Sequence, residues 1–237
     1  PHISFEDTYN FEQIRLYEPF TKAILTGDYE HPYISKKEIH YAGYHELAYL
    51  HPKRFTPDKS VLSELGITEG EKYVLLRFVS WNATHDKGHK GMSFENKLKA
   101  VQEFSKYAKV FISSEKELPA ELKRYLLPTA PEKVHSVMAF ASMIFGESAT
   151  MASEGVVLGV PGVYIDDTGR YYTAEQEKRY GMCFNFTESP EDQKKAIEKG
   201  VELLSQGADL SGHERMMRDK IDVTGFLEEV VKDTVRE

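Results

Sequence analysis

The stretch GESATMASEGVVLGVPGVYIDD (146–167) combines small residues with one carboxylate, Glu154, inside an expected short helix. Ser148 stands where that helix begins, directly after an apolar run. Free amides in the first turn and the helix dipole favour an anion such as phosphate at this point. Glu154 follows Thr150 by four residues, on the same helical face. A carboxylate in this position can accept hydrogen bonds from the vicinal hydroxyls of a ribose.

These residues predict a nucleotide site, with the diphosphate at the helix start near Ser148 and the ribose on Glu154. Here Glu154 is expected to face solvent in a cleft, so that its replacement leaves stability nearly unchanged. The alternative is that Ser148 only caps the helix and Glu154 is solvated or paired with a lysine.

Two further polar loops follow expected strands, and ligands of doubly wound sheets bind at the carboxyl ends of the strands. One is SWNATHDKGHKG (80–91) and the other is DDTGR (166–170). Polar and cationic groups are therefore expected to collect at one edge of the sheet. The residues that we expect to bind the substrate are Ser80, Asn82, His85, Lys90, Ser148, Thr150, Glu154 and Arg170.

The loop at 81–91 also contains His85, Asp86 and His89, whose spacing resembles that of zinc ligands on a helix. Gly88 and Gly91 disfavour the helix that would align them. We therefore expect no metal ion and no cofactor, and interpret the loop as a basic segment that closes over phosphate. It is expected to be mobile in the absence of ligand.

Strand-like and helix-like patterns alternate along the chain, which is typical of a parallel sheet with right-handed crossovers. The expected strands are 22–27, 38–43, 72–80, 109–114, 142–148, 162–166 and 182–186. The expected helices are 93–108, 131–141, 149–158, 173–181, 189–207 and 213–233. The fold class is therefore α/β, with a doubly wound parallel sheet.

Five of these strands lie in residues 72–237, enough for a complete Rossmann-like domain whose final helix packs back on the first part. Residues 1–50 hold only two or three strands, too few for a domain, and are interpreted as the carboxy-terminal tail of a truncated α/β domain. Residues 51–71 are polar, contain two prolines and are interpreted as a linker. Because the chain opens at Pro1, it is expected to be a piece of a longer protein.

Composition excludes several classes of protein. The 237 residues carry a formal net charge of −8, which disfavours a nucleic-acid partner. No apolar run approaches the roughly 20 residues of a membrane span. The single cysteine, Cys183, permits no intramolecular disulfide and fits a reducing compartment, so a cytoplasmic location is expected.

The segment FGESATMASEGVVLGVPGVYID (145–166) resembles the nucleotide-binding segment of GT-B glycosyltransferases and of the related UDP-N-acetylglucosamine 2-epimerases. YAGYHELAYLHPKRFTPD (41–58), YVLLRFVSWNATHDKGHKG (73–91) and GESATMASE (146–154) resemble the DUF354 family, whose members are described as GT-B-like. The DUF354 resemblance runs along nearly the whole chain, whereas the GT-B resemblance covers about residues 70–187.

The resemblance implies two Rossmann-like domains with a nucleotide sugar, expected to be UDP-linked, in the cleft between them. Ser148 and Thr150 would meet the diphosphate, Glu154 the ribose, and Arg170 the phosphates or the sugar. The His-Arg-x-Glu-Asn pattern of the epimerase loop is absent, since SWNATHD stands in its place (80–86), so no catalytic base is transferred.

The function implied is a glycosyltransferase of surface polysaccharide or glycoconjugate synthesis. A 2-epimerase-like enzyme and a non-enzymatic nucleotide-sugar binder are the alternatives. The acceptor is unknown, and a homo-oligomer is left open.

Overall fold

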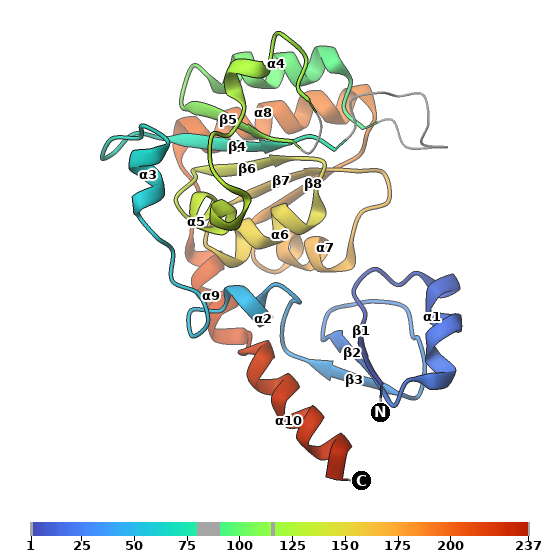
Figure 1. The fold of residues 1–237 in the computed structure, drawn as a ribbon. Coiled ribbons are helices and arrows are strands. Elements are labelled where there is room, and N and C mark those ends of the chain that lie inside the picture. Colours follow the sequence, from blue (N-terminus) through green and yellow to red (C-terminus); the bar gives the residue numbers. More distant parts are fainter. Residues whose placement is uncertain (1, 80–90, 115–116, 237) are drawn as a thin grey trace.

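The computed structural model describes residues 2–79, 91–114 and 117–236. Its larger sheet has five parallel strands in the order β5-β4-β6-β7-β8 (Figure 1). The strands are β4 (Tyr73–Arg77), β5 (Lys109–Ser113), β6 (Met143–Gly146), β7 (Gly162–Ile165) and β8 (Cys183–Phe186). The expected strands from residue 72 onward are thus confirmed, although their ends differ by a few residues.

Both faces of this sheet are buried, which explains why the strand sequences are apolar without alternation. Val74 and Leu76 of β4 belong to a cluster with α4 (Phe94–Phe104) and α8 (Pro190–Gln206). Tyr73 and Leu75 of the same strand face a second cluster that includes α5 (Val134–Ala139). Helices therefore cover the sheet on both sides, as a doubly wound fold requires (Figure 1).

Two helices connect the remaining strands on the α5 side of the sheet. They are α6 (Ala149–Val157), between β6 and β7, and α7 (Tyr171–Lys178), between β7 and β8. Ser148 caps α6, the role that the alternative interpretation of the sequence gives it, because its hydroxyl accepts a hydrogen bond from the amide of Met151.

A second, three-stranded parallel sheet has the order β1-β2-β3 and is formed by the amino-terminal residues (Figure 1). Its strands are β1 (Ile3–Phe5), β2 (Ala23–Gly27) and β3 (Glu38–Tyr41), and α1 (Phe11–Tyr17) connects the first two. The sequence predicts β2 and β3 but neither β1 nor α1. The three residues of β1 are only partly buried, so they carry no strong apolar signal.

The interpretation of residues 51–71 as a polar linker is wrong in part, because α3 (Ser60–Glu64) lies within this segment. Val61, Leu65 and Ile67 are buried in the cluster behind β4, so the segment is packed onto the large domain. The sequence did not predict this packing, because three apolar residues among many polar ones give too weak a periodic pattern. The other short helices of the described chain are η1 (Glu18–Phe20), α2 (Leu47–Leu50), η2 (Lys123–Tyr125) and η3 (Pro131–Lys133).

The expected single helix at 213–233 is two helices, α9 (Ser211–Asp219) and α10 (Val223–Arg236). The break falls at Lys220, which is extended and whose side chain is completely buried. Its ammonium contacts Asp28 at 2.9 Å and Glu175 at 3.2 Å. A buried charge needs such partners, and the chain leaves the helix to reach them.

Helix α10 packs back on the first part of the chain, as predicted (Figure 1). The ring of Phe226 lies against that of Tyr41 of β3 in a tilted arrangement, and the hydroxyl of Thr224 donates to the carbonyl of Ala48. In the part of the chain that the structure describes, no helix is long and apolar enough to cross a bilayer.

Gly212→Ala is expected to destabilise the fold. A Cβ at Gly212 would lie 1.8 Å from the carbonyl oxygen of Tyr180, so backbone would have to move, at a cost of about 1–3 kcal/mol. The matched control is Gly225→Ala in α10, where the nearest atom is a side-chain oxygen of Asp222 at 3.3 Å. Urea unfolding measures both, and equal stabilities would contradict this packing of α9.

Candidate functional site

The order of the strands places a topological switch between β4 and β6 of the large sheet. From β4 the chain crosses to β5 on one side, and it then returns to β6 on the other side. In such sheets the ligand crevice lies at the carboxyl ends of the two central strands. At those ends Arg77 pairs with Gly146, and a Cβ on Gly146 would lie 2.0 Å from the carbonyl oxygen of Arg77. Only glycine allows this close approach of the two backbones.

The amino terminus of α6 begins at this switch point. The hydroxyl of Ser148 accepts a hydrogen bond from the amide of Met151 at 3.3 Å, so Ser148 caps the helix. Within the described chain, the amides of Ala149 and Thr150 belong to the first turn and have no helical acceptor. The Thr150 side chain is exposed. The helix therefore presents free donors and the positive end of its dipole at the sheet edge.

Glu147, which the sequence analysis overlooked, holds both flanks of the 80–90 segment against this helix start. Its carboxylate accepts the amide of Val79 at 2.7 Å and the amide of Met92 at 2.6 Å. It also pairs with the buried ammonium of Lys97 at 3.0 Å. Burial lowers the pKa of Lys97, and the Glu147 carboxylate acts against that effect. The charge of Glu147 is thus compensated at least by Lys97 and two amides among the described residues, so Glu147 repels a nearby anion little.

Several predictions from the sequence fall on residues 80–90, which lie outside the described residues. They concern four expected substrate-binding residues, Ser80, Asn82, His85 and Lys90, and the possible metal cluster of His85, Asp86 and His89. The segment 81–91, which was expected to be mobile, lies almost wholly in the same range.

Glu154 lies where the sequence places it, on α6, but the expectation that it faces solvent is wrong. Its side chain is 9% exposed. One oxygen, Oε1, accepts the hydroxyl of Tyr49 at 2.9 Å and lies 2.9 Å from Nε2 of His135. Tyr49 comes from α2, and His135 from α5. The second oxygen, Oε2, has no hydrogen-bond partner among the described residues, so one oxygen is left for a ligand.

Arg170 belongs to the turn that follows β7. Asp166 organises this turn by accepting the amide of Thr168 at 2.7 Å and that of Gly169 at 3.2 Å. The Arg170 guanidinium donates through Nη1 to the Thr168 hydroxyl at 2.7 Å and to the Gly169 carbonyl at 2.6 Å. The side chain is folded onto its own turn and is half-buried, so contact with a ligand would require it to extend.

A cavity of about 440 Å³ lies beside the start of α6, at the carboxyl ends of β4 and β5. Its walls are mostly apolar, and one is formed by Met151 in the first turn of α6. The hydroxyl of Thr129, another lining residue, is buried without a hydrogen-bond partner in the described chain. Ligand sites are typically apolar clefts with a few polar groups, which matches this wall. The further lining residues include Arg77, Ser113, Leu126, Leu127 and Val134.

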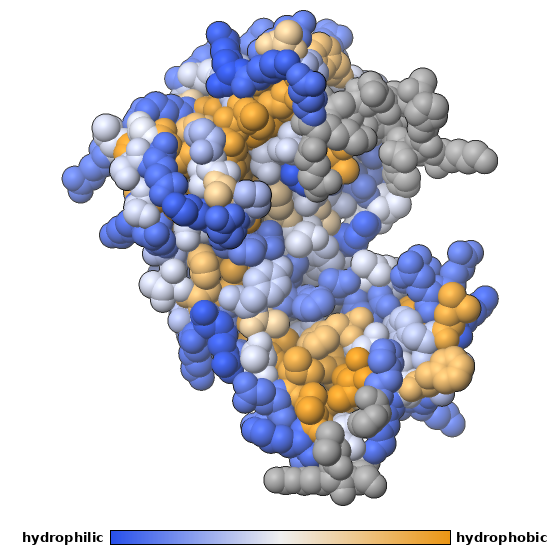
Figure 2. Space-filling view, in the orientation of Figure 1, coloured by the Kyte–Doolittle hydropathy of each residue, from blue (hydrophilic) through white to orange (hydrophobic). Residues whose placement is uncertain are grey.

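The surface is hollowed between the part with the small sheet and the part with the large sheet (Figure 2). Thr8 and Tyr9, which follow β1, line a cavity of about 370 Å³ there together with residues 168–171 and Ala174. Residues that follow β1 and residues of the large domain thus line this cavity together.

A group of ionisable side chains beneath this cleft was also overlooked. Burial raises the pKa of Glu46 to about 7, against a hydrogen bond from Ser153 that lowers it. Asp7 lies 3.6 Å from Nδ1 of His45, and this interaction raises the pKa of His45 against the effect of burial. Glu46 and Asp7 come from different elements of the amino-terminal part, so no local motif marks them.

Comparison with known proteins identifies the fold but not a family. No protein-family model matches the chain, and no curated protein sequence matches it. The chain is similar to the UDP-GlcNAc 2-epimerase of Neisseria meningitidis bound to UDP-GlcNAc, with a TM-score of 0.61 and 14% identity over 98% of this chain and 68% of that chain.

Two further structures are similar to the chain. One is the S. aureus MnaA–UDP structure, with a TM-score of 0.53 and 12% identity over 92% of this chain and 68% of that chain. The other is a variant of Os79 from O. sativa in complex with UDP, with a TM-score of 0.57 and 12% identity over 92% of this chain and 56% of that chain. The chain therefore has a GT-B-like α/β fold with two parallel sheets, a fold also found in UDP-GlcNAc 2-epimerases.

Proposed function

We propose that this protein binds a nucleoside-diphosphate sugar, UDP-linked, at the carboxyl edge of the large sheet and acts in glycosyl transfer. The observation that carries the proposal is the amino terminus of α6 at the β4/β6 switch point, with the amides of Ala149 and Thr150 free in the first turn. Structures with the same fold contain UDP or UDP-GlcNAc, which supports this choice of ligand.

Three neighbouring features would each bind one part of the nucleotide. The cavity of about 440 Å³ would take the base, with the unpaired hydroxyl of Thr129 in its wall. Met151 lies in that wall and Glu154 is three residues further along α6, so a ribose next to the base would meet the carboxylate. The diphosphate would then lie at the helix start.

In glycosyl transfer the diphosphate is the leaving group, and negative charge grows on it as the bond to the sugar breaks. Helix-terminus amides fixed in place before the reaction stabilise such charge without reorganising. The Arg170 guanidinium, if extended from its turn, would add a cation on the side of the cleft that faces the small sheet. The acceptor and the catalytic base would come from groups other than these.

Ala149→Pro tests the helix-terminus site by removing one amide donor. Proline is favoured at the first helical position, and the extended conformation of Ser148 (φ −103°, ψ 109°) accommodates a following proline. We expect the affinity for UDP and for inorganic pyrophosphate to fall about tenfold to hundredfold, for one charge-assisted hydrogen bond of about 1.5–3 kcal/mol. Isothermal titration with both ligands measures this.

Thr150→Ala keeps every amide and removes an exposed hydroxyl that is itself expected to meet the diphosphate, so it measures the contribution of that hydroxyl separately from that of the Ala149 amide. A melting curve of each variant separates lost binding from lost folding. If a folded Ala149→Pro variant binds UDP and pyrophosphate as well as wild type does, the diphosphate does not bind at the amino terminus of α6. NMR of UDP-GlcNAc with the protein, with and without candidate acceptors, distinguishes the reactions: transfer requires an acceptor, 2-epimerisation does not, and binding without turnover indicates a non-enzymatic binder.

A further inference from the structure

Three metal-ligating side chains meet at the edge of the small sheet, away from the α6 site. Glu38 and His40 are two residues apart on β3, so both side chains lie on the same face of the strand. His31 comes from the loop between β2 and β3. One ligand atom from each of the three lies within 4.8 Å of the other two, and Oε2 of Glu38 is 3.3 Å from Nε2 of His40.

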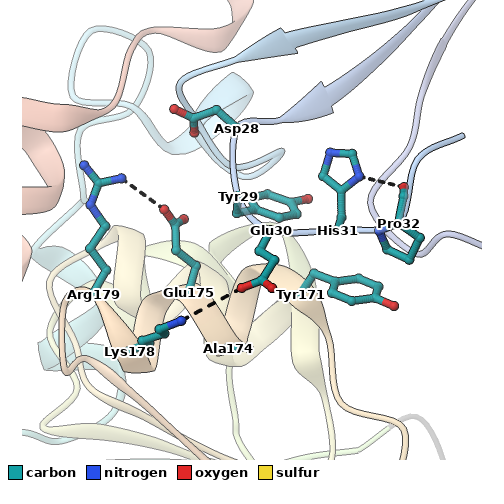
Figure 3. Close-up of a pocket in the computed structure, with 10 residues that line it drawn as sticks. All are labelled: Asp28, Tyr29, Glu30, His31, Pro32, Tyr171, Ala174, Glu175, Lys178 and Arg179. Carbon is teal, nitrogen blue, oxygen red and sulfur yellow. Dashed lines mark hydrogen bonds and ion pairs between the residues drawn. The ribbon is translucent and has the colours of Figure 1, made fainter. Parts of the chain in front are cut away.

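Each of the three side chains is oriented by a hydrogen bond on its other polar atom. Nδ1 of His31 donates to the carbonyl of Pro32 at 2.9 Å, which leaves Nε2 as the lone-pair nitrogen (Figure 3). Nδ1 of His40 lies 3.3 Å from the hydroxyl of the buried Thr26. Metal-binding histidines nearly always have such a partner on the second nitrogen.

The two carboxylate oxygens of Glu38 also have different partners. Its Oε1 accepts the amides of Ile34 and Ser35, the latter at 2.8 Å, while Oε2 faces His40. The Glu38 side chain is 6% exposed, so its negative charge is held in the protein and favours a cation beside it. This arrangement is more specific than an exposed acidic cluster, because one polar atom of each residue already has a partner and the remaining ligand atoms face one another.

We propose that His31, Glu38 and His40 bind a zinc ion, with a fourth coordination position that is open. Two imidazoles and one carboxylate are a common zinc set with bonds of about 2.0–2.2 Å. In a tetrahedral site with these bonds, neighbouring ligand atoms lie roughly 3.3–3.6 Å apart. The 3.3 Å between Glu38 and His40 already meets that value. The rings of His31 and His40 are stacked, with centroids 5.2 Å apart and planes 15° from parallel, so zinc binding requires the imidazoles to turn until both lone pairs point at the ion.

Of the three proposed ligands, His31 also lines a cavity of about 780 Å³ between the loop after β2 and α7. His31 and Pro32 line its rim, and Figure 3 shows them beside Tyr29 and Tyr171. His40 is about half exposed, so the ion can enter from solvent. Bound zinc would also tie the β2–β3 loop to β3. The simpler arrangement is an ion pair between Glu38 and a protonated His40, which binds no metal.

Zinc titration of the metal-free protein tests the proposal. We expect one tight site per chain, a higher melting temperature with zinc, and intense visible bands of a tetrahedral complex when cobalt(II) replaces zinc. His31→Gln and Glu38→Gln are each expected to remove the tight site while the metal-free protein keeps its fold, since the Glu38→Gln side chain can still accept the two loop amides. Thr26→Val removes only the partner of His40 and is expected to weaken zinc binding about tenfold to hundredfold.

The double variant His85→Ala/His89→Ala is the matched control, because it removes the other pair of histidines with zinc-like spacing. It is expected to keep the tight site and the cobalt spectrum. The proposal is overturned if the wild-type protein binds no zinc, if His31→Gln and Glu38→Gln bind it as well as wild type does, or if the His85/His89 variant loses it.

Discussion

Glu154→Gln is expected to lower the affinity for UDP about tenfold to hundredfold and to leave the affinity for pyrophosphate nearly unchanged. Glutamine keeps the size of the side chain and the helix, and its carbonyl can keep the contacts that Oε1 makes with Tyr49 and His135. The remaining atom changes from an acceptor into a donor, so a ribose hydroxyl loses a charge-assisted hydrogen bond of about 1.5–3 kcal/mol. Pyrophosphate has no ribose and is unaffected.

The structure adds a stability loss to this prediction. Glu154 is buried between α2 and α5, and glutamine replaces two charge-assisted contacts with neutral ones. The free energy of unfolding is expected to fall by roughly 1–3 kcal/mol. Urea unfolding measures this loss, whereas the sequence alone predicted nearly unchanged stability.

Tyr49→Phe is the matched control for this variant. It removes one contact to Oε1 but keeps the carboxylate, so it is expected to lower stability while UDP binding persists. If Glu154→Gln binds UDP as well as wild type does, Glu154 is a structural residue that joins three helices, and the ribose lies elsewhere.

Glu46→Gln is expected to make the protein more stable than wild type above pH 7. Burial raises the pKa of Glu46 to about 7 in the folded state, above its ordinary value of 4.5. The folded protein therefore holds this proton more tightly than the unfolded chain does. The stabilising contribution is fully present below pH 4.5 and is lost as the pH rises through 7.

Because of this pKa shift, the wild-type free energy of unfolding is expected to fall by roughly 3 kcal/mol between about pH 4 and pH 8. The Glu46→Gln variant does not lose this stability, because its amide does not ionise. The measurement is urea unfolding of both proteins at several pH values, with Glu198→Gln, an exposed position on α8, as the control. A constant difference between wild type and Glu46→Gln across this range would show that Glu46 titrates normally.

The elements of the large domain could be predicted because their signals are local. Ser189 and Pro190 mark the start of α8, and the apolar run at 72–80 marks β4. The start of α6 was found in the same way, from Ser148 after a strand. Each of these features depends on residues within about one turn or one strand, so the chain itself contains the information.

Most of the features that were missed depend on residues distant in sequence. Asp222, whose carboxylate accepts the amide of Gly225, is a local signal for the start of α10 that was missed. The burial of Lys220 is not local, because its ammonium reaches Asp28, 192 residues away. The sequence predicts that Glu154 lies in an open cleft, because the residue that contacts its carboxylate, Tyr49, is 105 residues away.

The sequence by itself thus determined the α/β class, the five strands of the larger sheet and the position of the helix start that would bind an anion. Only the tertiary structure decided which polar groups are buried and with what partners. Burial and partners set whether Glu154 is solvated, whether Glu46 holds a proton near neutral pH, and whether His31 meets Glu38 and His40. The physical reason is that helix caps and strand patterns act through neighbouring residues, whereas desolvation and hydrogen bonding act through whatever the fold brings into contact.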